Sequence, residues 1–92
     1  MVLTLHVRPE GTRQFLARVF DGKQLVGEPS VHARVDEAIA RYGAQGSQQF
    51  PGVTAFSIWY GGWSVGEVSL EDMRMQAPQL ASRLEVLSAV VR

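Results

Sequence analysis

The chain has 92 residues, and a domain of this length buries roughly 60–65% of its unfolded surface, enough for one modest core spanning residues 1–92. Apolar residues make up 46% of the sequence, which is ordinary for a globular domain. Nine basic residues balance nine acidic ones, and this zero net charge argues against tight nonspecific binding to nucleic acid or to membranes. Cysteine is absent, which excludes disulfides, thiolate nucleophiles and cysteine-based metal sites.

The beginning of the chain predicts a strand. Residues 3–8 alternate apolar and polar, as a half-buried strand does. No basic region precedes an apolar run here, so we expect no signal peptide. No apolar run elsewhere approaches the roughly 20 residues that span a bilayer. We therefore expect a soluble cytoplasmic protein.

A hairpin is predicted next. Pro9–Thr12 indicates a turn, and Arg13–Phe20 indicates a second strand with apolar groups on both faces, which favours a central position in the sheet. The dipeptide Asp21-Gly22 is typical of a tight hairpin turn. Pairing across it would set Phe20 opposite Lys23.

The first helix has two candidate starting points. One set of apolar residues shares the spacing of a single helical face: Val31, Val35, Ala38, Ile39 and Tyr42. Ser30 is then a candidate cap and Gly43 a candidate stop. The alternative begins the helix at Asp36 and leaves residues 31–35 extended, because these residues also alternate.

The segment from Gly43 to Gly52 predicts a long loop, since it is rich in glycine, serine and glutamine and contains Pro51. A loop of this length in so small a domain is either mobile or functional. Its glutamines, Gln45, Gln48 and Gln49, are therefore candidates for contact with a partner.

The most informative stretch is an aromatic hairpin. Gly61-Gly62 predicts a two-residue turn between strands over residues 53–60 and 63–69. Pairing across this turn places three bulky residues of the first strand opposite three of the second, and we expect this face to be core. The predicted pairs are Tyr60 with Trp63, Ile58 with Val65, and Phe56 with Glu67.

The other face of this hairpin surrounds Trp59 with small side chains, together with Val68: Ala55, Ser57, Ser64 and Gly66. This pattern leaves two interpretations. A helix packs closely over the small residues with Trp59 at its edge, or Trp59 is exposed and anchors a protein partner. The second interpretation predicts a partner-binding set: Trp59, Ser57, Ser64, Gln45, Gln48 and Gln49.

The end of the chain predicts helix. Ser69 with Asp72 three residues later is typical of a capping box. Pro78 interrupts the following apolar stripe, which predicts a kink or two abutting helices with Pro78 in a first turn. The stripe either covers the sheet or, widened by Val86 and Val90, forms a homodimer. The predicted interface residues are Leu80, Leu84, Leu87 and Val91.

Catalytic and metal-binding motifs are not evident. Neither His6 nor His32 has a carboxylate or a second histidine at ligand spacing, so we predict no metal and no cofactor. No serine lies in a nucleophile-elbow context. Gly61–Gly66 has the length of a phosphate-binding loop, but Glu67-Val68 follows where lysine and serine or threonine are required.

Two families share parts of this pattern. Residues 15–23 followed by residues 36–39 resemble the strand–hairpin–helix opening of HicB-type antitoxins, although Gly27-Glu28-Pro29 replaces the Pro-Gly step of that family. The layout of strand, hairpin with Asp21-Gly22-Lys23, helix and second hairpin resembles small phage-encoded anti-CRISPR proteins. Neither resemblance carries functional residues over to this chain.

These observations predict an α+β fold: an antiparallel sheet of four or five strands with two helices on one face, in the order strand-strand-strand-helix-strand-strand-helix. We expect a non-catalytic inhibitor or adaptor of a protein partner, anti-CRISPR-like and encoded by a phage or mobile element. The alternative is a HicB-like antitoxin or nucleic-acid accessory domain. In either case we expect only weak nonspecific binding to duplex nucleic acid.

Overall fold

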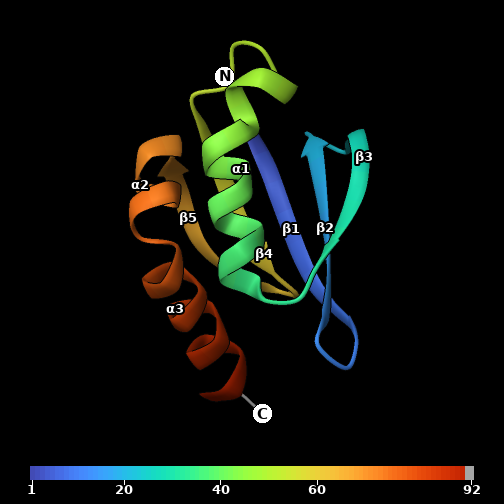
Figure 1. The fold of residues 1–92 in the computed structure, drawn as a ribbon, viewed down its shortest axis with the longest axis vertical. Helices are drawn as coiled ribbons and strands as arrows, with labels where there is room; N and C mark the ends of the chain where they lie inside the picture. Colours follow the sequence, from blue (N-terminus) through green and yellow to red (C-terminus); the bar gives the residue numbers. More distant parts are fainter. Residues whose placement is uncertain (91–92) are drawn as a thin grey trace.

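A computed structural model describes residues 1–90 as a five-stranded sheet with helices packed on one face (Figure 1). The elements are β1 (Val2–Gly11), β2 (Gln14–Asp21), β3 (Gln24–His32), α1 (Val35–Gln49), β4 (Ala55–Tyr60), β5 (Trp63–Ser69), α2 (Leu70–Met75) and α3 (Ala77–Val90). The strand order across the sheet is β3-β2-β1-β4-β5. The α+β class is thus confirmed, and β2 is central as predicted.

The sheet is mixed, so the prediction of a wholly antiparallel sheet was wrong. β1 pairs antiparallel with β2 but parallel with β4, from Val2 beside Ala55 to Val7 beside Tyr60. After β3 the chain returns through α1, which acts as the crossover that a parallel pair requires. Hairpins are visible in local sequence, whereas this pairing joins the two halves of the chain.

The start of α1 follows the shorter of the two predicted helices. The helix begins at Val35, while Ser30 and Val31 pair in β3 with Ala17 and Leu16 of β2. The prediction of a helix capped by Ser30 was therefore wrong. Ladder hydrogen bonds to β2 hold these residues extended and outweigh their helical spacing.

The predicted stop at Gly43 and the long loop after it were also wrong, because α1 continues to Gln49. Gly43 and Gly46 are buried on the helix. A Cβ added at Gly43 would lie 2.7 Å from the Cβ of Met73 and 2.9 Å from the backbone nitrogen of Arg74. Gly43 therefore lets α2 approach α1 closely and does not end the helix.

The first hairpin turns one residue later than predicted. Asp21 pairs with Gln24 and Phe20 with Leu25, so Gly22 and Lys23 form the turn and the predicted pairing of Phe20 with Lys23 was wrong. Gly22 has φ +62°, a conformation that favours glycine.

In the second hairpin the Gly61-Gly62 turn and the Tyr60–Trp63 pair are confirmed. Beyond them the register shifts: Trp59 pairs with Ser64 but Ile58 pairs with Gly66, which leaves Val65 as the extra residue of a β-bulge. The predicted pairs of Ile58 with Val65 and Phe56 with Glu67 were therefore wrong.

The bulge changes which residues reach the core. Phe56 pairs with Val68, so Val68 turns to the helix-covered side and is buried. The side chain of Ser64 bridges the bulge by donating to the Ile58 carbonyl (2.9 Å) and accepting from the Gly66 N–H (2.9 Å).

The C-terminal segment forms two abutting helices, which makes three helices in residues 1–90 where two were predicted. Ser69 caps α2 as expected, because its hydroxyl oxygen accepts the Asp72 N–H at 3.1 Å. Pro78 lies in the first turn of α3. No helix in this described range is long and apolar enough to cross a membrane.

The core lies between the sheet and the helices. Leu5 of β1, Phe56 and Ile58 of β4, Ile39 of α1 and Leu84 of α3 are fully buried there. The rings of Tyr42 and Phe56 meet edge-on at 6.0 Å, which links α1 to the sheet. Because all of this burial is on one side, the opposite side of the sheet stays uncovered.

Candidate binding face

The uncovered side of the sheet, named the open face below, is defined by strand alternation. Leu3, Leu5 and Val7 of β1 are buried beneath the helices, so Thr4, His6 and Arg8 point the other way. The pairing registers then identify the residues that lie beside each of these positions on the neighbouring strands. The rows are Leu25–Phe20–Thr4–Ser57–Glu67, Arg18–His6–Trp59–Ser64 and Val31–Leu16–Arg8.

Trp59 lies on the open face with 37% of its surface exposed. Its indole Nε1 donates to Ser57 Oγ at 3.1 Å, which orients the ring. The helices cover the opposite side of the sheet, so the interpretation in which a helix packs over Trp59 was wrong. Trp63, in contrast, points to the helix side but is only half-buried there.

The two serines predicted to contact a partner make their hydrogen bonds within the sheet itself. Ser57 accepts the hydrogen bond from Trp59, and the Ser64 hydroxyl bridges the bulge. Ser64 pairs with Trp59 across β4 and β5, and Ser57 lies two residues before Trp59 on the same face of β4, so the structure brings these three predicted residues together. Their hydroxyls position the tryptophan and its strand.

Gln45, Gln48 and Gln49 do not join Trp59. All three are exposed residues of α1, which packs on the other side of the sheet. A partner seated on the open face would not reach them. The predicted binding set is thus divided between two sides of the molecule, because the segment expected to be a loop is helical.

A histidine and an arginine occupy the centre of the open face. His6 and Arg18 are direct partners across β1 and β2. His6 Nε2 lies 3.1 Å from the Gly61 carbonyl oxygen, so this nitrogen carries the hydrogen and Nδ1 is the unprotonated one. Burial lowers the pKa of His6, and the nearby charges of Arg18 and Arg8 lower it further against the opposing effect of the Gly61 hydrogen bond. We therefore expect a neutral ring at pH 7.

Arg18 also contacts an aromatic ring. Its guanidinium carbon lies 5.4 Å from the ring centroid of Phe20, which is within cation–π range. Arg8 is within 3.8 Å of Glu10, an exposed pair of little energetic weight. Arg18 and Phe20 could not be grouped with Trp59 from the sequence, because β2 and β4 lie far apart along the chain and only β1 between them brings them into one sheet.

The apolar stripe of the last helix is mostly internal. Leu80 and Leu84 are 5% and 0% exposed within the protomer, so they belong to the core and are not free for a dimer. Leu87 is 38% exposed and Val86 57% exposed. Val91 lies outside the described residues. Over residues 80–89, the large apolar side chains that remain exposed are therefore Val86 and Leu87.

A second polar cluster was not foreseen. Ser30 Oγ lies 2.8 Å from His32 Nε2 and 2.9 Å from the Tyr42 hydroxyl, which ties the edge strand β3 to α1. His32 is buried, and this burial lowers its pKa, helped by Arg41 and opposed by Glu37. The hydroxyl of Ser30 is shared between two neighbours, so we interpret the cluster as structural. The only sequence signal was the alternation of Ser30 and His32 in a strand.

Within the part of the chain that the structure describes, no group of three or more histidine, aspartate or glutamate residues could hold a metal ion. The open face combines aromatic rings, aliphatic side chains and the two arginines Arg8 and Arg18. No family model, curated protein or solved structure matches this chain.

Proposed function

We propose that the protein acts without catalysis, by binding a protein partner through the open face. The observation that supports this most directly is the composition of that face. Four of its side chains are large, apolar and exposed: Val2 (42%), Leu25 (46%), Val31 (58%) and Trp59 (37%). An uncovered sheet face that serves only as solvent boundary normally alternates to polar residues. Exposed apolar side chains gathered on one face of a sheet in this way are typical of an interaction surface.

The residue types also fit a protein partner. Tryptophan and arginine are the commonest energetic anchors of protein interfaces, and the open face holds Trp59 and Arg18 in the same row. An inhibitor and an adaptor would both use such a surface, since each acts by occupying part of its partner.

Nucleic acid is the weaker candidate for the same surface. Trp59 and Phe20 could stack on bases, but stacking platforms work within a cationic groove. The cations of the open face are Arg8, which is beside Glu10, and Arg18, while Glu67 adds a negative charge at β5. This balance favours a protein.

The proposal is tested by capturing partners from the native host with three immobilised forms: wild type, Trp59→Ala and Met75→Ala. Met75 is the matched control, because it is 71% exposed but lies on α2, away from the open face. We expect Trp59→Ala to lose a protein that the other two retain, since an aromatic anchor contributes about 2 kcal/mol or more.

Circular dichroism first establishes that Trp59→Ala is folded. The proposal is contradicted if folded Trp59→Ala retains every protein that wild type captures. Nuclease-sensitive recovery of nucleic acid by wild type, lost in Trp59→Ala, would replace the protein partner by a nucleic acid.

A further inference from the structure

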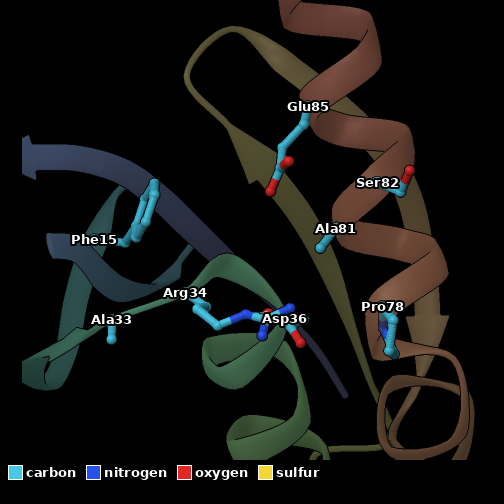
Figure 2. Close-up of a pocket in the computed structure, with 8 residues that line it drawn as sticks. All are labelled: Phe15, Ala33, Arg34, Asp36, Pro78, Ala81, Ser82 and Glu85. Carbon is cyan, nitrogen blue, oxygen red and sulfur yellow. Dashed lines mark hydrogen bonds and ion pairs between the residues drawn. The ribbon is translucent and has the colours of Figure 1, made fainter. Parts of the chain in front are cut away.

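A cleft of about 380 Å³ lies on the helix side of the molecule, away from the open face (Figure 2). One wall is α3 and the other is the corner where β3 leads into α1, with Phe15 of β2 beside it. Its apolar lining comes from Phe15, Ala33, Pro78 and Ala81. Both the size and the mixture of apolar surface with a few charges are typical of a ligand site.

The charges of the cleft do not cancel. Arg34 and Asp36 form an ion pair, with Nε 2.9 Å from Oδ1. Glu85 on α3 has no ion-pair partner among residues 1–90. Figure 2 shows its carboxylate extending from α3 toward the opposite wall, which carries Phe15 and Arg34. The cleft therefore holds one uncompensated negative charge facing an aromatic ring.

We propose that this cleft binds a single arginine side chain of a partner protein. A guanidinium is planar, so it can pair with the Glu85 carboxylate through two parallel hydrogen bonds and stack against the Phe15 ring. The methylene groups of the same side chain match the apolar surface of Ala81 and Pro78. The site is separate from the open face and does not depend on the function proposed for it.

Arg34 lowers the affinity of this site for an arginine side chain. Its guanidinium carries the same charge as the incoming side chain and also neutralises Asp36. Removing the Arg34 charge should therefore favour the ligand, whereas removing the Glu85 charge should disfavour it. These opposite effects distinguish an arginine site from a cleft that accepts any apolar group.

The test is a titration of ¹⁵N-labelled protein with the peptide acetyl-Ala-Arg-Ala-amide, followed by NMR. We expect saturable shifts at the amides of Ala33 and Ala81 with a Kd of the order of 1 mM, as befits one side chain. The same peptide with citrulline, which is neutral and nearly the same shape, should bind about tenfold more weakly, since charge-assisted hydrogen bonds are roughly twice as strong as neutral ones.

Three variants complete the experiment. Glu85→Gln should weaken binding about fivefold and Arg34→Gln should tighten it about twofold, in line with one charge pair at a partly exposed site. Glu37→Gln is the matched control, because Glu37 is an exposed carboxylate in the first turn of α1 that does not line the cleft. Trp59→Ala should leave the titration unchanged, which separates this site from the open face.

The proposal is overturned if the arginine peptide shows no saturation, if the citrulline peptide binds equally well, or if Glu85→Gln and Glu37→Gln behave alike. Glu85 is exposed, so its substitution should leave the fold intact, and the NMR spectrum of each variant reports this directly.

Discussion

His6 of β1 and Arg18 of β2 lie directly opposite each other on the open face. Each holds a buried nitrogen, Nδ1 and Nε respectively, that has no hydrogen-bond partner among residues 1–90. An unprotonated Nδ1 next to a guanidinium is compatible with the lowered pKa of His6. Protonation would place a second positive charge beside Arg18. This pair makes the open face sensitive to acid.

Acidification should destabilise the protein. His6 and His32 both have folded-state pKa values below the usual 6.5, so the unfolded chain takes up protons first as the pH falls. Their stability contribution is present above about pH 6.5 and is lost as the pH falls from there to the lower folded pKa values. Urea unfolding at about pH 7.5 and about pH 5.5 measures this loss, which should be smaller in His6→Gln and His32→Gln. Equal losses of stability in wild type and in both variants would show that the two histidines do not cause the acid sensitivity.

Gly43→Ala should destabilise the fold although alanine is the better helix former. The new Cβ would meet the Met73 Cβ at 2.7 Å and the Leu70 carbonyl oxygen at 2.9 Å, so α2 must move. We expect a loss of roughly 1–3 kcal/mol in the free energy of unfolding, typical of overpacking. Gly62→Ala is the control, because nothing lies within 4 Å of its added Cβ and its φ is not positive. Increased stability of Gly43→Ala in chemical denaturation would refute the close packing of α1 and α2.

Ser30→Ala should loosen the contact between β3 and α1. The substitution leaves the Tyr42 hydroxyl and His32 Nε2 without their shared partner in a largely buried position. Leaving such groups unsatisfied costs about 1–3 kcal/mol, whereas Ser30→Thr keeps the hydroxyl and should lose less. Thermal unfolding compares the two variants. If Ser30→Ala unfolds at the same temperature as wild type, water replaces the hydroxyl without cost and the prediction is wrong.

The last helix offers a test of its two predicted roles. Leu84 is fully buried, so Leu84→Ala should lose about 2–5 kcal/mol of stability. Val86→Glu, at an exposed position, should stay folded. A homodimer through this helix stays a prediction, now limited to the exposed Val86 and Leu87. Sedimentation in which wild type is dimeric and Val86→Glu monomeric would support it, and a monomeric wild type at high concentration would exclude it.

Several features were predicted correctly from local sequence because the interaction that decides them is local, although the first hairpin turn was misplaced by one residue. Alternation indicated the strands, Gly61-Gly62 indicated the second hairpin, and Ser69 indicated the start of α2. Pro78 indicated the break before α3. In each case the responsible hydrogen bond or steric limit joins residues only a few positions apart.

Tertiary structure decided the remaining features because they depend on contacts between distant segments. Val31 is extended despite its helical spacing because it pairs with Leu16 of β2. Gly43 lies inside α1 because Met73 packs closely against it. The bulge at Val65 moved Val68 into the core, and the parallel pairing of β1 with β4 brought Trp59 into one row with His6 and Arg18. Sequence thus determined the elements and the residue types available for binding. Only the fold, by burying one side of the sheet and leaving the other uncovered, decided which of them share a surface.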